Sequence, residues 1–204
     1  MSDTIPDWLA GTLAKTQGGD ARLAISNLAI SKLGSGKTLA RGGFALKSAA
    51  FRDGEELDPC FTADEEDAVA PPLEWTAPPP GAQEIAIIVE DASADNGEPT
   101  CHWLVWGLPG QKGQLLEGET PPRVGKNAHQ NSEWLLPAPP HDDPAHLYVF
   151  QAFALELPLT LMPGADRAEL MRQIENNVVA CAVLSGTYAR EEPDDSWDDE
   201  DEAD

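Results

Sequence analysis

The stretch PAPPHDDPAHLYVFQAFALE, residues 137–156, joins a proline-rich loop to a long apolar segment. Proline has no backbone N–H to give to a sheet, so the first part predicts an irregular loop. The segment HLYVFQAFAL at 146–155 combines aromatic and β-branched residues and predicts a strand. His146 and Tyr148 stand two residues apart, which places both side chains on the same face of that strand.

Further strand-like segments lie on both sides of this one. The segment IAIIVED at 85–91 is a run long enough for a buried strand, and CHWLVWG at 101–107 and VVACAVLSGTY at 178–188 add two more. The segments LAISNLAI at 23–30 and FALKSAAF at 44–51 are shorter and alternate only in part. Such a set predicts a mostly β, antiparallel assembly. We expect a sandwich rather than a barrel, although the spacing of the strands fits both.

One short helix is expected late in the chain, between Asp166 and Asn176. Asp166 can cap its first turn, and Glu169 follows three residues later, as in a capping box. The apolar side of this helix consists of Leu170, Met171 and Ile174.

The two ends of the chain differ in composition from the middle. Residues 1–20 predict an N-terminal extension with a short helix, in which Trp8 docks onto the body or onto a partner subunit; a frayed terminus is the alternative. Residues 21–190 form the expected β domain. The segment 191–204 holds ten acidic residues and no Lys or Arg, which predicts a disordered acidic tail.

The charge of the chain limits its partners. The formal net charge is −23, and the chain without its tail still has 26 acidic residues against 13 basic ones. Such a surface repels nucleic acid and anionic membranes, so neither is an expected partner. No apolar run approaches the roughly 20 residues of a membrane span. Three separated cysteines and an N-terminus without a signal peptide favour a reducing compartment, and we expect a cytoplasmic protein.

Two of the candidate functional residues lie at strand ends. Asp91 ends the segment at 85–91, where a carboxylate can point into a cleft; a solvated acid that caps the next loop is the alternative. His102 opens the segment at 101–107. Alternation predicts that His102 shares a face with Leu104 and Trp106, opposite Cys101 and Trp103; a satisfied interior histidine is the alternative.

His146 and Tyr148 are the remaining candidates from the residues alone. An imidazole and a phenol on one face offer hydrogen-bond donors for a small oxyanion, while a half-buried cross-strand pair is the plain alternative. Neither the GxSxG motif of serine hydrolases nor the HExxH motif of zinc proteases occurs in the chain.

Several of these pieces occur in an order that resembles the phosphatidylethanolamine-binding protein family, in particular its bacterial Raf-kinase-inhibitor-like branch. The resemblance covers about residues 23–190. The pieces are SAAFRDGEELDPCFT (48–62), PPLEWTAPPPGAQEIAIIVEDASA (71–94), CHWLVWGLP (101–109) and PAPPHDDPAHLYVFQAFALE (137–156). The resemblance implies a β-sandwich with a small cavity for phosphate-like or carboxylate-like anions. The ligand-binding residues that it implies are Asp91, His102, Pro139, Pro140, His146 and Tyr148.

The chain departs from the family pattern in two motifs. At residues 91–95, Ser93 stands where the family has a second aspartate, and both prolines of that motif are absent. In the proline loop, Leu136 and Asp142 stand where the family has glycines. Glycine permits close backbone approach to a ligand. We therefore expect Leu136 to narrow the cavity or shift its loop, and Asp142 to add a negative charge nearby.

The leading hypothesis is a non-enzymatic, small-anion-binding regulatory module that needs no metal or cofactor. The alternative is a hydrolase or lyase, in which Asp91, His102 and His146 serve as general acid and base or hold a metal ion. A protein partner, and a homodimer contacted through the Trp8 segment, are further expectations.

Overall fold

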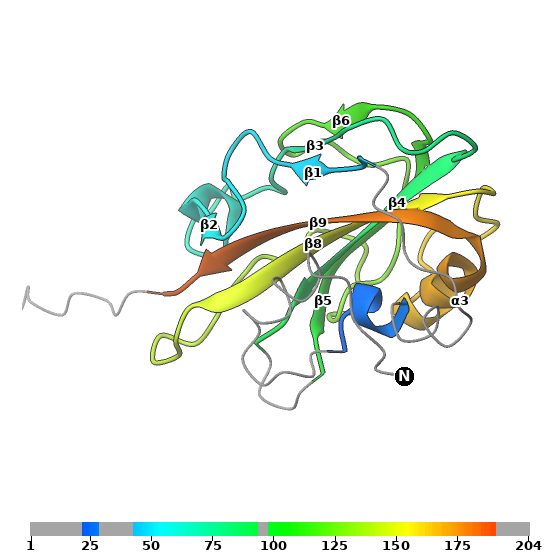
Figure 1. The fold of residues 1–204 in the computed structure, drawn as a ribbon. Coiled ribbons are helices and arrows are strands. Elements are labelled where there is room, and N and C mark those ends of the chain that lie inside the picture. The colour runs from blue at the N-terminus through cyan, green and yellow to red at the C-terminus, as the bar shows by residue number, and fades with distance from the viewer. Residues whose placement is uncertain (1–21, 29–42, 94–97, 191–204) are drawn as a thin grey trace, which may run out of the picture.

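The computed structural model describes residues 22–28, 43–93 and 98–190, which form two β-sheets and a layer of helices (Figure 1). The large sheet has the spatial order β2, β9, β8, β4, β5, β7. Its strands are β2 (Glu55–Glu56), β9 (Val178–Tyr188), β8 (His146–Leu155), β4 (Glu84–Asp91), β5 (Thr100–Pro109) and β7 (Arg123–Val124). The small sheet contains β1 (Leu46–Lys47), β3 (Leu73–Trp75) and β6 (Gly113–Leu115). The β2–β9 pair is parallel, and the other described pairs are antiparallel.

Both faces of the large sheet are covered. One apolar cluster fills the space between the two sheets, where Trp75 of β3 and Leu115 of β6 meet Ile87 and Phe150 of the large sheet. A second cluster lies on the opposite face, under helix α3 (Arg167–Asn177) and a short helix over residues 24–28 (Figure 1). This burial on both faces explains why every residue of β4 is buried. The sequence-based prediction of a β-sandwich with a late helix is confirmed, with the helices as a third layer.

The four long predicted strands are present. β8 and β9 begin and end at the predicted residues, whereas β4 and β5 extend slightly beyond the segments predicted for them. The segment before β8 is irregular from residue 134 to residue 145, as its prolines predict. In α3, Asp166 Oδ1 accepts the Glu169 N–H at 2.8 Å and Glu169 Oε2 accepts the Asp166 N–H at 3.0 Å, so the predicted capping box is confirmed.

The strand predicted at 23–30 is wrong for the residues that the structure describes. Residues 24–28 are helical, and the N–H groups of Ala24 and Ile25 donate to the side chains of Glu90 (2.8 Å) and Gln151 (2.8 Å). A short apolar run fits a helix and a strand equally well. Here β4 and β8 already pair on both sides, so the segment packs across their face and has no strand edge to join.

The strand predicted at 44–51 is mostly absent as well. Only Leu46 and Lys47 pair with β3. The Ser48 hydroxyl then accepts the Ala50 N–H at 3.1 Å and donates to the Pro72 carbonyl at 2.7 Å. This local bonding turns the chain away from the ladder, as serine often does in turns.

The predicted ends of the chain, residues 1–20 with Trp8 and residues 191–204, lie outside the described residues. Among the described residues, no helix has the length and apolar character needed to cross a membrane.

Candidate ligand-binding site

The register of three neighbouring strands gathers the candidate residues. Asp91, the last residue of β4, lies opposite Tyr148 of β8 on one side and opposite Thr100 of β5 on the other. His146 precedes Tyr148 by two residues and lies on the same strand face. Residues from distant parts of the chain therefore meet at one end of β4.

A β-bulge decides the direction of His102. Val89 pairs with Trp103 and Glu90 pairs with Cys101, so His102 is the extra residue between two paired positions. Its ring lies 5.2 Å from that of Tyr148, in an edge-to-face arrangement, on the side of the cluster between the two sheets.

This direction corrects the face predicted from alternation. Leu104 and Trp106 belong to the cluster under the helices, so His102 does not share their face. Cys101 lies in that same cluster, so its predicted separation from His102 is confirmed. The predicted separation of Trp103 from His102 is wrong, because Trp103 belongs to the cluster between the two sheets. Strict alternation fails here because the bulge inserts one residue into β5.

All six predicted ligand-binding residues line one cavity of about 210 Å³. They are Asp91, His102, Pro139, Pro140, His146 and Tyr148. Thr100, His129 and Leu135 are among the other lining residues, and sequence reasoning did not identify them. The geometric part of the sequence-based prediction therefore holds, while ligand binding by these residues stays a prediction.

Asp91, His146 and Asp143 form a chain of charges on one side of the cavity. His146 Nδ1 lies 2.7 Å from Asp91 Oδ2, and its Nε2 lies 3.4 Å from Asp143 Oδ2. Burial disfavours the charged imidazole, but the hydrogen bonds and charges of Asp91 and Asp143 outweigh it and raise the pKa of His146. Proton binding to His146 is thus favoured by the two carboxylates that flank its ring.

His102 is held in the opposite protonation state. Its Nδ1 lies 2.6 Å from the Leu135 carbonyl, which only accepts, so Nδ1 carries the proton. Burial, with only 4% of the residue exposed, lowers the pKa of His102 despite the Leu135 bond and the Asp91 charge. The neutral ring therefore presents an unprotonated Nε2, for which no partner exists among the described residues.

Tyr148 supplies a phenol to the same cavity. The residue is 1% exposed, and burial, followed by the nearby Asp91 charge, raises the pKa of its hydroxyl, so the phenol stays protonated. Within the described chain this hydroxyl has no hydrogen-bond partner, and it does not belong to the fully buried unpaired atoms, so it is accessible from the cavity.

Asn127 is the centre of a hydrogen-bonded loop that contributes His129 to the cavity. Sequence reasoning did not identify this residue. It is 2% exposed; its Nδ2 donates to Asn131 Oδ1 (2.6 Å) and to the Glu133 carbonyl (3.0 Å), and its Oδ1 accepts the His129 N–H (2.9 Å). These bonds fix the backbone of residues 129–133, with His129 at the cavity and Trp134 directly after the loop. No periodic pattern marks such a residue, because all of its partners lie within one irregular loop.

Three of the departures from the family pattern, Ser93, Leu136 and Asp142, lie differently with respect to the cavity. The Ser93 hydroxyl accepts the Leu147 N–H at 2.9 Å, and the Ser93 N–H donates to Asp91 Oδ1 at 2.8 Å, so Ser93 ties the end of β4 to the start of β8. Leu136 lines the cavity, as expected. Asp143, rather than the expected Asp142, brings the added charge to His146.

The cavity is lined by side chains that can form hydrogen bonds with a ligand. In the described ranges, no three His, Cys, Asp or Glu side chains are grouped as a metal ion would require. What the cavity offers is a phenol, a neutral imidazole and a charge-balanced histidine. A β-sandwich with such a polar cavity defines a ligand-binding module.

Comparisons with known proteins place the chain in a family. The phosphatidylethanolamine-binding protein family profile matches residues 47–189. An Aquifex aeolicus UPF0098 protein is 32% identical over 164 residues, which cover 76% of this chain and 95% of that protein. A Mycobacterium tuberculosis protein with the lipoprotein name LppC is 33% identical over 147 residues, which cover 70% of this chain and 71% of that protein. The chain belongs to the phosphatidylethanolamine-binding protein family.

A solved structure agrees with this assignment. The chain is similar to the phosphatidylethanolamine-binding protein homologue CT736 from Chlamydia trachomatis, with a TM-score of 0.66 and 28% sequence identity. The match covers 72% of this chain and 98% of that protein.

Proposed function

We propose that this protein is a non-enzymatic binding module for a small oxyanion, a phosphate-like or carboxylate-like group on a small molecule. The observation that carries the proposal is the pair of polar atoms, the Tyr148 hydroxyl and His102 Nε2, which belong to residues lining one cavity and have no hydrogen-bond partner among the described residues. Neither belongs to the fully buried unpaired atoms of those residues, so both are accessible and available to a ligand. A ligand that supplies an acceptor to Tyr148 and a matching group to His102 satisfies both.

The bound oxyanion has a defined set of partners in this proposal. One oxygen accepts a hydrogen bond from Tyr148, and a second faces His102 Nε2. His146, whose pKa is raised, provides a favourable potential when it is protonated, while Asp91, already bonded to that histidine, limits the site to one anion. A small anion has few atoms, so the expected Kd for phosphate is on the order of mM.

A proton accompanies the anion. The neutral His102 cannot donate from Nε2 because its proton is used at the Leu135 carbonyl. Either the ligand brings an acidic O–H, as monoprotonated phosphate does, or His102 takes up a proton on binding.

Replacing Tyr148 by phenylalanine tests the proposal. Loss of one hydrogen bond to a charged group, worth about 1.5–3 kcal/mol, is expected to weaken phosphate binding by roughly tenfold or more. The measurement is a phosphate titration followed by the NMR signals of the imidazole rings, with exposed Asp142→Asn as the control variant. If the parent rings do not respond to phosphate, or if Tyr148→Phe binds phosphate as the parent does, the proposed site is wrong.

Asp143→Asn is expected to act in the opposite direction. Asp143 competes with the ligand for the Nε2 proton of His146, at 3.4 Å, and its charge repels an anion. The carboxylate is about one-third exposed, so solvent screens it, and we expect phosphate affinity to rise only about two- to fivefold. The same NMR titration at about pH 6 checks this, at a pH where histidines usually begin to gain protons. An unchanged or weaker affinity would remove Asp143 from the site.

The natural ligand is a small anionic molecule in this proposal, and the cytoplasm is its expected location. Free thiols at Cys60 and Cys101 are in keeping with a reducing compartment.

A further inference from the structure

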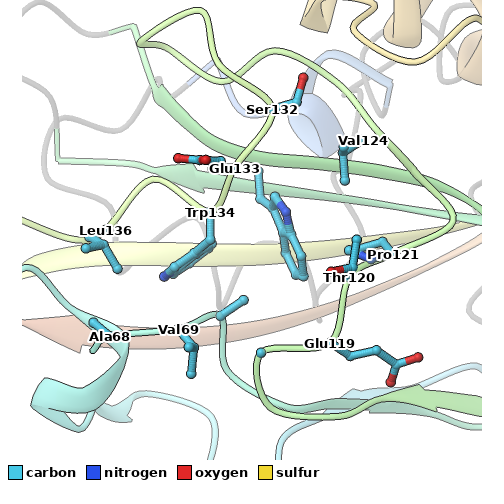
Figure 2. Close-up of a pocket in the computed structure, with 13 residues that line it drawn as sticks. Ala68, Val69, Glu119, Thr120, Pro121, Val124, Ser132, Glu133, Trp134 and Leu136 are labelled. Atoms are coloured by element: carbon cyan, nitrogen blue, oxygen red, sulfur yellow. The ribbon is translucent and has the colours of Figure 1, made fainter. Parts of the chain in front are cut away.

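A second, larger cavity of about 400 Å³ lies beside the candidate anion site (Figure 2). Loop residues 68–70, 118–121 and 132–136 contribute to its wall, together with Trp103 of β5 and Val124 of β7. Figure 2 shows Ala68, Val69 and Leu136 on one side of this space and Val124 with Pro121 on the other. The proposed anion site does not use this cavity.

The partition between the two cavities is thin. Leu136 lines both. Trp134 lines the larger cavity, and its ring lies 6.0 Å from the ring of His102, which lines the smaller one. Trp134 is held in place because its Nε1 donates to the Phe61 carbonyl at 3.0 Å and its ring stacks on Phe150 at 6.0 Å. A molecule in the smaller cavity therefore contacts the wall of the larger one.

The larger cavity has a mainly apolar lining and one unused donor. Trp103 is 3% exposed, and its ring meets that of Trp134 edge to face at 5.7 Å. Its indole N–H has no acceptor among the described residues and does not belong to their fully buried unpaired atoms, so it is available to an acceptor atom of a ligand. Glu119 and Glu133 also line the cavity, and Figure 2 shows the Glu119 carboxylate turned away from Trp134. These charges oppose a second anion in this space.

We propose that the larger cavity is a subsite for the uncharged, apolar part of an amphipathic ligand whose anionic group occupies the smaller cavity. This inference rests on the proposed function and adds the ligand class: a small organic phosphate or carboxylate with one anionic end and an aromatic or branched apolar group. The two parts are joined past Leu136, which lines both cavities, by a short linker such as a propyl chain.

The test compares 3-phenylpropyl phosphate with n-propyl phosphate. The phenyl group is expected to increase affinity by about tenfold or more, because it leaves water for the apolar cavity. NMR separates the two sites: the rings of His102 and His146 report on the anion, and the methyl groups of Val69 and Val124 report on the subsite. Both phosphates should shift the rings, and only the phenyl compound should shift the methyl groups strongly.

A filling variant makes the test specific. Ala68 is half-buried on a loop of the larger cavity, and Ala68→Phe is expected to remove the tenfold advantage while leaving n-propyl phosphate affinity unchanged. Ala77→Phe, at an exposed loop position that does not line the cavity, should keep the advantage. The parent methyl shifts decide the question even if Ala68→Phe does not fold.

The outcomes distinguish the two proposals. If phosphate shifts the rings but the phenyl compound binds no tighter and leaves the methyl groups unmoved, the subsite is wrong and the proposed function stands. If neither phosphate shifts the rings, the proposed function is wrong. If neutral 3-phenylpropanol shifts the methyl groups equally well with and without saturating phosphate, the cavity is independent and the proposed link fails.

Discussion

Replacing Arg167 by methionine is expected to lower the free energy of unfolding by about 3 kcal/mol. Arg167 Nε donates to Glu90 Oε1, and the Glu90 side chain is completely buried in the large sheet. Removing the arginine leaves a buried carboxylate without its countercharge, a change that typically costs about 3–5 kcal/mol. We expect the lower end of that range because Arg167 is 28% exposed and water can partly replace it.

The Glu90 carboxylate also holds two other parts of the fold. Its Oε2 accepts from Gln151 Nε2 at 2.7 Å and from the Ala24 N–H at 2.8 Å, and Arg167 Nη2 donates to the Arg22 carbonyl at 2.8 Å. The Glu90 side chain of β4 therefore connects this strand to β8, to the start of α3 and to the helix over residues 24–28. A buried hydrogen-bond network that loses one member lowers the stability of the fold, because the remaining polar groups are left without partners.

A double variant separates the charge from the packing. In Arg167→Met with Glu90→Gln, the neutral carboxamide keeps an acceptor for Gln151 and Ala24 and needs no countercharge, so most of the lost stability should return. Arg172→Met, an exposed position of the same helix, should change stability by less than about 0.5 kcal/mol. Urea denaturation measures all four proteins. A single variant as stable as the parent, or a double variant without recovery, would contradict the account.

The affinity for sulfate is expected to rise by up to tenfold for each unit that the pH falls from about 7.5 towards about 6. Sulfate does not titrate in this range, so the proton must come to the protein. Burial lowers the pKa of His102, and the ring is therefore neutral at the start of the range. Binding an anion favours the charged ring, whose Nε2 can donate, so each bound sulfate takes up one proton. The gain levels off once the pH is below the pKa of His102.

His146 should contribute to this slope mainly in its upper part and little in its lower part. Burial opposes its charge, but Asp91 and Asp143 outweigh burial and raise the pKa of His146, so the ring gains its proton at a higher pH than an ordinary histidine. Asp91 also faces His102 and favours its charged form, although burial is the larger effect.

Calorimetry in two buffers with different ionisation enthalpies gives both the affinity and the proton uptake. His102→Gln should bind sulfate with a much weaker dependence on pH in the lower part of this range, whereas His129→Gln, at an exposed lining position, should keep the parent's slope there. A flat profile in the parent, or an unchanged slope in His102→Gln, would show that His102 is not the group that takes up the proton.

Local patterns predicted much of the fold because they depend on residues close together in the chain. The long strands β4, β5, β8 and β9 follow from apolar runs bounded by turns, and α3 follows from Asp166 and Glu169 at capping-box spacing. The same patterns failed at residues 24–28, where backbone donors are satisfied by side chains of distant strands.

At the candidate site, too, some residues could be predicted from the sequence and others could not. His146 and Tyr148 share a face because of strand period alone, and the family resemblance named the other candidates in advance. Sequence spacing gave no sign of His129, of Asp143 as the partner of His146, or of Asn127 as the centre of a loop. These three residues lie in loops, and their positions at the site depend on the path that each loop takes in the folded chain.

By itself, the amino-acid sequence determined the strands, the late helix and the kinds of side chain available for an anion, because period and capping act within a few residues. Only the tertiary structure decided the direction of His102, since the bulge in β5 exists through its pairing with β4. It also decided that the pKa of His102 is lowered and that of His146 is raised, because burial, the Leu135 carbonyl and the two carboxylates reach these rings from separate parts of the chain. Side chains that are far apart in sequence share an electric field only after folding has removed the water between them.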